Sequence, residues 1–190
     1  MYEVRLHGRG GQGTVLGSTI LAKALVAEGK HVTAIPSFGF ERRGAPVAAY
    51  LRFDTKEIRR MNRIYTPDCI VCIDPTVRRA VDIFEGMRHG GTLVQTSKQR
   101  LEAFALPACV ATVGLCDAVG IALELFGKAI TNTVMLGAFA RTTGLVSLDS
   151  LREALDESQF RDGGLAQNAQ ALQRGYAETV VHRLEVGATA

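Results

Sequence analysis

The sequence contains no tryptophan, and aromatic residues make up only 6% of its 190 residues. Its basic residues occur as scattered pairs and never as a run, so the basic stripe with interleaved aromatics that nucleic-acid binding favours is missing. No apolar run is long enough to span a bilayer, and the first residues lack the apolar core of a signal peptide. We therefore expect a cytoplasmic protein that binds neither nucleic acid nor membranes.

Cysteine is also scarce, with four residues in the chain. Cys69 and Cys72 have C-x-x-C spacing, but the surrounding run, CIVCID, predicts a buried strand, where residues three apart point to opposite faces. No second C-x-x-C follows, and no spacing of histidines suggests a metal site. We expect no metal and no iron–sulfur cluster in this chain, and we interpret the cysteines as small core residues.

The sequence begins with a strand pattern that runs into a glycine-rich turn. Val4 and Leu6 alternate with polar residues from Tyr2 onward, and helical spacing follows the turn to about Gly29. The turn fits G-x-G-x-x-G and comprises Gly8, Arg9, Gly10, Gly11, Gln12 and Gly13. Two interpretations remain open: a backbone cradle for an anion such as a phosphate of coenzyme A, or a tight turn that lets the helix pack closely on the sheet.

A dinucleotide site of this type also needs an acidic residue at the end of the second strand. That strand is predicted at His31 to Ile35, and the first carboxylate after it, Glu41, lies well inside a loop. The motif alone is weak evidence. A free-standing NAD-binding oxidoreductase is therefore kept only as the alternative function.

The loop from Pro36 to Pro46, PSFGFERRGAP, is the second unusual segment. Arg42 and Arg43 could clamp a carboxylate or phosphate, or they could form salt bridges with Glu41 or a neighbouring subunit. Phe38 could close over an active site or lie in a subunit contact. Candidate cofactor-binding residues in this loop are Ser37, Phe38, Arg42 and Arg43.

Further strands and helices alternate along the rest of the chain. The spacing predicts a strand at 47–53, a connection with helical character at 54–63, a strand at 69–74, a helix from 75 to about 86, strands at 93–94 and 108–113, and helices at 116–126, 131–141, after Ser147, and from about 164 to 184. Asn132 starts a buried helix, either as a cap or as a ligand contact.

This alternation predicts an α/β fold: a Rossmann-like, mostly parallel, doubly wound sheet with a helical C-terminal third. With 47% hydrophobic residues, the chain can bury one core, so we expect a single domain over residues 1–186 and a short tail over 187–190. Both special loops, and Asp74 at the end of a third strand, then lie at the carboxyl edge of the sheet, where ligands bind in such folds.

The two loops together resemble the γ subunit of thiamine-dependent 2-oxoacid:acceptor (ferredoxin) oxidoreductases. HGRGGQG at 7–13 and PSFGFERRGAP at 36–46 carry the likeness, which continues through PDCIVCID at 67–74, NTVMLGA at 132–138 and TGLVSLDSL at 143–151. Phe40 departs from it, because the family most often has a proline there.

The resemblance implies a division of labour among subunits. Thiamine diphosphate, magnesium and iron–sulfur clusters would belong to α, β and ferredoxin-like δ partners, and the complex would convert a 2-oxoacid and coenzyme A into an acyl-CoA. This chain would bind no cofactor tightly and contribute no catalytic residue, with a possible contact to coenzyme A. A purely structural assembly role is the third hypothesis, and the particular 2-oxoacid and electron acceptor are not specified.

Overall fold

The computed structural model describes residues 1–37, 44–156 and 164–185. Its strands are β1 (Tyr2–Arg9), β2 (His31–Ser37), β3 (Pro46–Asp54), β4 (Cys69–Cys72), β5 (Gly91–Thr96), β6 (Val110–Cys116) and β7 (Val180–Arg183). Its helices are α1 (Thr14–Ala27), α2 (Ala118–Phe126), α3 (Asn132–Thr143), α4 (Leu148–Glu153) and α5 (Leu165–Glu178), with short 3₁₀ turns η1 (Pro75–Arg79) and η2 (Leu101–Ala103). The predicted tail at 187–190 lies outside the described residues.

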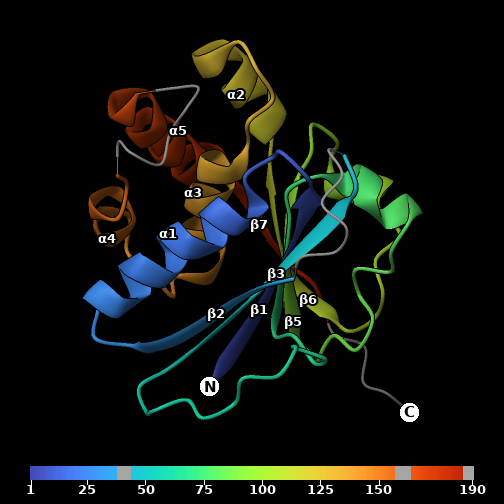
Figure 1. The fold of residues 1–190 in the computed structure, drawn as a ribbon. Helices are drawn as coiled ribbons and strands as arrows, with labels where there is room; N and C mark the ends of the chain where they lie inside the picture. Colours follow the sequence, from blue (N-terminus) through green and yellow to red (C-terminus); the bar gives the residue numbers. More distant parts are fainter. Residues whose placement is uncertain (38–43, 157–163, 186–190) are drawn as a thin grey trace.

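The strands form one seven-stranded sheet in the order β2-β3-β1-β4-β5-β6-β7 (Figure 1). Strands β1, β4, β5 and β6 are parallel, whereas β3 is antiparallel to both β1 and β2, and β7 is antiparallel to β6. The predicted α/β class with a mostly parallel sheet is confirmed. Because β1 and β2 flank β3 and run in the same direction, the loops that follow them lie at the same edge.

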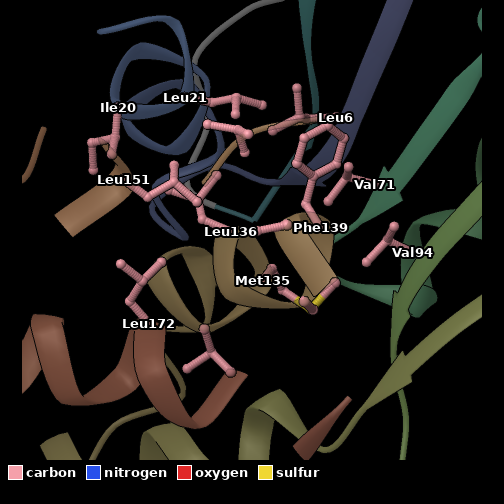
Figure 2. Packing of buried hydrophobic residues seen from close by; sticks show 14 of the residues in the cluster. Leu6, Ile20, Leu21, Val71, Val94, Met135, Leu136, Phe139, Leu151 and Leu172 are labelled. Carbon is pink, nitrogen blue, oxygen red and sulfur yellow. The ribbon is translucent and has the colours of Figure 1, made fainter. Parts of the chain in front are cut away.

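The α-helices all contribute to one core on one face of the sheet. Figure 2 shows α3 in the centre of this layer, with Met135, Leu136 and Phe139 packed among side chains from the strands and from the other helices. Each of these three side chains is at most 2% exposed. The nearly continuous apolar sequence of α3 is explained by this position, because the helix is covered on both sides.

Connecting segments cover the opposite face of the sheet (Figure 1). Val77, Ile83 and Met87 close a second core there over Ile70 and Leu93. For this reason the alternation of apolar and polar residues in β1 does not distinguish a buried face from a solvent-exposed face. Both faces of that strand are buried.

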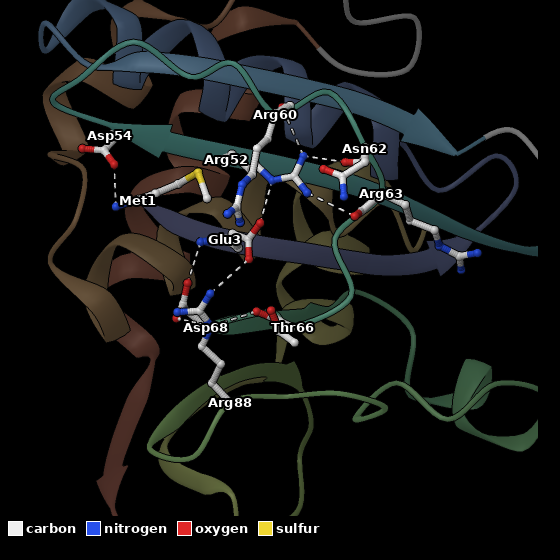
Figure 3. A network of polar contacts seen from close by, with 10 residues as sticks. All are labelled: Met1, Glu3, Arg52, Asp54, Arg60, Asn62, Arg63, Thr66, Asp68 and Arg88. Carbon is white, nitrogen blue, oxygen red and sulfur yellow. Dashed lines mark hydrogen bonds and ion pairs between the residues drawn. The ribbon is translucent and has the colours of Figure 1, made fainter.

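Glu3 of β1 forms ion pairs with the segments that surround it (Figure 3). The Nε atom of Arg52 donates to Glu3 at 2.6 Å, and both side chains are at most 5% exposed. Arg88 approaches the other carboxylate oxygen of Glu3 at 3.4 Å. This buried ion pair joins β1, β3 and the segment that contains Arg88.

Two predictions on this face are wrong: the connection with helical character at 54–63 and the helix at 75–86. Residues 55–63 are irregular, and Arg52 donates to the backbone carbonyls of residues 60, 62 and 63 (Figure 3). Arg5 donates to the carbonyls of Ile83 at 2.7 Å and Glu85 at 2.8 Å, and the predicted helix 75–86 shortens to η1. In each case a buried guanidinium binds carbonyls near the end of the segment and holds that segment against the sheet.

The last predicted helix is also too long, because α5 ends at Glu178. The following Val180 and Val181 are β-branched and form β7, which pairs with the edge of β6. Smaller differences concern strand ends: the strand predicted at 69–74 stops at Cys72, and the one predicted at 93–94 extends over β5. Within the described residues, none of the helices combines the length and apolarity needed to cross a bilayer.

Candidate functional site

The candidate site lies at the carboxyl edge of the sheet, between β1 and β4. The chain leaves β1 to build β2 and β3 on one side, and then crosses to β4 on the other side. Such a switch point is where open α/β sheets bind ligands. The Ile73 amide donates to the His7 carbonyl at 2.7 Å, so the ends of β1 and β4 are held together at this point.

The two special loops meet directly at this edge. The Gly10 amide donates to the Ala45 carbonyl at 2.9 Å, and the Gly44 amide donates to the Gly10 carbonyl at 3.2 Å. Arg9 and Pro46 are also paired in the sheet register. The sequence prediction that these loops lie side by side is confirmed for the described part of the second loop.

The side chain of Arg9 connects three segments at the edge of the site: the glycine loop, the second loop at Gly44 and the η1 turn at Thr76. Its guanidinium donates to the Gly44 carbonyl at 2.8 Å, and to the hydroxyl and carbonyl of Thr76 at 2.8 and 3.0 Å. Its Nε atom also lies 3.5 Å from the Asp74 carboxylate. These contacts use three of the five N–H donors of the guanidinium, so the described residues leave one N–H on each terminal nitrogen for a ligand contact.

Gln12 and Asp74 bridge the glycine loop and the end of β4. The Nε2 atom of Gln12 donates to Asp74 at 2.7 Å, while its Oε1 atom accepts from the Arg9 amide at 2.8 Å. Asp74 is also the N-cap residue of η1, because its carboxylate accepts from the Thr76 amide at 2.9 Å. Partial burial raises the pKa of Asp74, but the hydrogen bonds from Thr76 and Gln12 and the charge of Arg9 outweigh it and hold the pKa below its ordinary value.

The glycine loop ends at the N-terminus of α1. Gly13 is the N-cap residue, with a left-handed φ of 73°, and the first helical bond runs from the Gly17 amide to the Gly13 carbonyl. The amides of residues 14–16 therefore precede the hydrogen-bonded ladder, and no side chain in the described part of the chain caps them. These amides and the helix dipole favour an anion at this end of the helix.

Asn132 lies beside this helix start. A Cβ atom on Gly13 would lie 2.5 Å from its Nδ2 atom. Asn132 is the first residue of α3 and Thr131 is the cap residue, so its interpretation as a cap is wrong. The contact with Gly13 brings together two predicted site residues that are far apart in the sequence.

Two polar atoms here are buried without a hydrogen-bond partner among the described residues: Oδ1 of Asn132 and Oγ1 of Thr14. The residues are 3% and 2% exposed. Buried polar groups are normally satisfied, so these two atoms are free to bind a water, an ion or a ligand. Thr14 was not predicted as a site residue, although its position directly after the glycine motif was a usable signal.

His7 lies next to the loop but is poorly suited to proton transfer. It is 5% exposed, and burial first, then the charges of Arg5 and Arg63, lower its pKa to about 3. Its ring therefore stays neutral near pH 7. A base that must exchange protons at that pH needs a pKa close to it.

The remaining predicted site residues belong to the second loop. Ser37 is the last residue of β2 and pairs with Ala48. Phe38, Arg42 and Arg43 lie outside the described residues, so the arginine clamp and the aromatic cover stay predictions.

The described residues contain no group of three histidine, cysteine or acidic side chains placed to hold a metal ion. The cysteines are free, and burial raises the pKa of Cys72 to about 12. A thiol with such a pKa is a poor nucleophile. Within the described part of the chain, the site therefore consists of the backbone amides at the start of α1 and the unsatisfied side-chain oxygens of Thr14 and Asn132. The hydrogen bonds of Arg9 and Gln12 hold the surrounding loops together.

Comparisons with known proteins agree on one family. The family model described as "Pyruvate ferredoxin/flavodoxin oxidoreductase" matches residues 3–178. The chain is 64% identical to the γ subunit of NADH-dependent phenylglyoxylate dehydrogenase from Aromatoleum evansii, over all of both chains. It is 47% identical to the common γ subunit of pyruvate/ketoisovalerate oxidoreductases from Thermococcus kodakarensis, over 97% of this chain and all of the relative.

A solved structure matches the fold as well. The crystal structure of pyruvate oxidoreductase subunit PORC from Thermotoga maritima superimposes with a TM-score of 0.79 at 33% sequence identity. The match covers 96% of this chain and 98% of that one.

Proposed function

The chain belongs to the pyruvate ferredoxin/flavodoxin oxidoreductase family, as a γ-type subunit, and from this premise we propose that it borders the coenzyme A side of a shared reaction site. The complex would oxidise a 2-oxoacid with loss of carbon dioxide and transfer the acyl group to coenzyme A. Thiamine diphosphate, which supplies the decarboxylation chemistry, would be held with magnesium by partner α and β subunits. Iron–sulfur clusters on β and a ferredoxin-like δ subunit would carry the electrons away.

The observation that supports a binding role is the group of unsatisfied polar atoms at the start of α1. The amides of residues 14–16 suit a phosphate oxygen of coenzyme A. The buried Oδ1 atom of Asn132 is an acceptor, and it would take a hydrogen bond from a hydroxyl or amide group of the same ligand. Arg9, Gln12 and Asp74 would hold the glycine loop in position against its neighbouring segments through the contacts described above.

For the substrate, we favour an aromatic 2-oxoacid of the phenylglyoxylate type, with NAD as the electron acceptor of the whole complex. The support is the 64% identity to a subunit of an enzyme named for that substrate and for NADH. Pyruvate or ketoisovalerate is the second candidate, supported by the 47% identity to a subunit named for those oxidoreductases. Substrate specificity would reside mainly on partner chains, so the subunit likeness only ranks these candidates.

The experiment is to purify the complex through a tag on this chain and measure its activity. Phenylglyoxylate should be oxidised faster than pyruvate, with coenzyme A required and NAD reduced. The variant N132A should raise the KM for coenzyme A by roughly tenfold, the effect of one lost hydrogen bond in a buried site, and leave the KM for the 2-oxoacid unchanged. Unchanged coenzyme A kinetics in N132A would contradict the contact.

A matched control uses two threonines of the same helix. T14V removes the buried hydroxyl beside the glycine loop, whereas T19V removes an exposed hydroxyl on the outer side of α1. Only T14V should alter coenzyme A kinetics. Equal effects of the two variants would point to a general disturbance of α1.

The alternative of a free-standing NAD-dependent enzyme is tested on the isolated chain. Strand β2 carries no carboxylate from His31 to Ser37, so the ribose of a dinucleotide has no acidic partner there. Calorimetry with NADH should therefore show no micromolar binding. Micromolar affinity, or turnover of a substrate by the chain alone, would favour the alternative.

A further inference from the structure

The connection from β3 to β4 spans residues 55–68 and contains no helix or strand. Connections of this length without regular structure are uncommon in compact proteins, and those that occur often carry function. This segment crosses the face of the sheet that α1 does not cover, and the polar network in Figure 3 runs beneath it. The coenzyme A proposal gives it no role.

The chain's excess positive charge is concentrated in residues 55–65, hereafter the basic segment. Lys56, Arg59, Arg60 and Arg63 are its basic side chains, and Glu57 is its one acidic side chain. The net charge of the whole chain is +3, so the remaining residues carry equal numbers of basic and acidic side chains. The basic segment therefore accounts numerically for the whole net positive charge of the chain.

The same segment exposes large apolar side chains. Met61 is 72% exposed and Tyr65 is 66% exposed, more than any other large hydrophobic residue among those described. The Arg59 side chain is 88% exposed, and its contact with Glu57, at 3.7 Å, joins two side chains in open solvent. Arginine, methionine and tyrosine are the residue types enriched where proteins meet.

The backbone of the basic segment is fixed although its side chains are exposed. The buried Arg52 guanidinium donates to the carbonyl of Asn62 at 2.5 Å and to that of Arg63 at 3.1 Å (Figure 3). Ile64 is an anchor at 1% exposure, and the Tyr65 carbonyl oxygen lies so close to Gly86 that a Cβ atom there would clash with it. A segment already held in one conformation loses little entropy on binding, which favours its use as a contact surface.

We propose that the basic segment is a docking surface for a carboxylate-rich surface on another polypeptide of the complex. Its charge selects an acidic partner, and Met61 with Tyr65 supplies the apolar area that a protein contact needs. Single-stranded nucleic acid would need several stacking aromatics, and an anionic membrane would need an apolar helical face, neither of which this segment has. The inference requires only that the chain is a subunit of a complex, so it stands even without the coenzyme A contact.

The first test is zero-length cross-linking of the complex purified through a tag on this chain. A carbodiimide joins an amine to a carboxylate only when the two groups are in contact. Lys56 should be linked to an aspartate or glutamate of a different polypeptide, identified by mass spectrometry, and K56Q should lose that link. Links from Lys56 only to residues of this chain would overturn the proposal.

The second test reverses two charges in the basic segment and compares this variant with a control variant that has the same change in net charge. R59E/R60E should weaken association with the partner subunits at least tenfold at low salt, measured by native mass spectrometry across a dilution series. The control, K23E/R152E, makes the same charge change at exposed positions on the helical side and should leave association unchanged. Circular dichroism checks that both variants fold.

Two results would contradict the docking proposal. Equal association of the two double variants would show that the basic segment does not face a partner. Tight binding of a 30-nucleotide RNA or of phosphatidylserine vesicles by the wild-type chain, lost in R59E/R60E, would assign the surface to nucleic acid or to membrane instead.

Discussion

Gly13 and Asn132 touch so closely that a Cβ atom on Gly13 would lie 2.5 Å from the amide nitrogen of Asn132. The contact joins the first turn of α1 to the first turn of α3, and it lies at the edge where the glycine loop ends. Gly13 is thus constrained twice, by its left-handed φ of 73° and by its neighbour. Dense packing at this point explains how a loop rich in glycine keeps one shape.

The variant G13A should therefore be strongly destabilised. The left-handed backbone costs about 1 kcal/mol for alanine, and the contact with Asn132 adds roughly 1–3 kcal/mol. Gly29 has a φ of 79°, and no atom lies within 4 Å of the place that an alanine Cβ would take, so G29A should lose only the backbone part. Urea unfolding of the two variants measures the difference, and equal losses would show that the Asn132 contact carries no cost.

A second prediction concerns the buried Glu3–Arg52 pair. E3Q leaves the guanidinium of Arg52 at 2% exposure without its charged partner, and it also removes the charge that faces Arg88. Loss of one member of a buried pair typically costs 3–5 kcal/mol, so we expect a loss of about that size in the free energy of unfolding. The exposed pair of Arg59 and Glu57 supplies the control, because E57Q should change stability by less than about 0.5 kcal/mol. A loss below 1 kcal/mol in E3Q would contradict the buried network.

The sequence predicted the central architecture because local patterns and tertiary structure agree there. The strand, glycine turn and helix of residues 2–27 are found as predicted, and the two special loops meet at the carboxyl edge. Strand direction was less predictable. Nothing in the local pattern of residues 46–54 shows that β3 inserts between β1 and β2 as an antiparallel strand.

The wrong predictions lie where buried arginines contact the connecting segments. Arg5 and Arg52 look like solvent-facing residues of alternating strands, yet they are buried and donate to backbone carbonyls of connecting segments, at a separation of 78 residues for Arg5–Ile83 and 10 residues for Arg52–Asn62. Both connections are irregular or form only a short 3₁₀ turn where helical structure was predicted. At the site, the packing of Asn132 on Gly13 depends on the placement of α3, which the spacing of residues along the chain does not specify.

A third prediction follows from the buried, neutral ring of His7. Burial and the nearby charges of Arg5 and Arg63 lower its pKa from 6.5 to about 3. As the pH falls below about 6.5, the unfolded chain binds a proton at this position and the folded chain does not, so His7 destabilises the fold progressively down to about pH 3. H7Q removes this titration. Stability measured from pH 7 to pH 4 should fall less steeply in H7Q than in the wild type, and identical slopes would contradict the assignment.

Glu28 provides the last prediction, because it fastens the end of α1 to the start of α4. Its carboxylate accepts from the Ser147 amide at 2.7 Å and from Lys30 at 3.0 Å. Burial raises its pKa, but the hydrogen bonds from Ser147, Lys30 and Ser150 outweigh it and lower the pKa from 4.5 to about 2. The ionised carboxylate therefore stabilises the fold fully above about pH 4.5, and this contribution is lost as the pH falls toward 2.

E28Q should accordingly lose about 1–2 kcal/mol at pH 7, with the gap to the wild type closing as the pH falls from about 4.5 toward 2. E153Q, on the exposed side of α4, is the matched control and should change stability by less than about 0.5 kcal/mol. Denaturant unfolding at several pH values measures both variants. If the difference in unfolding free energy between E28Q and the wild type stays constant down to pH 2.5, the ionised carboxylate is not the stabilising group. Glutamine and protonated Glu28 would then differ for a reason other than charge.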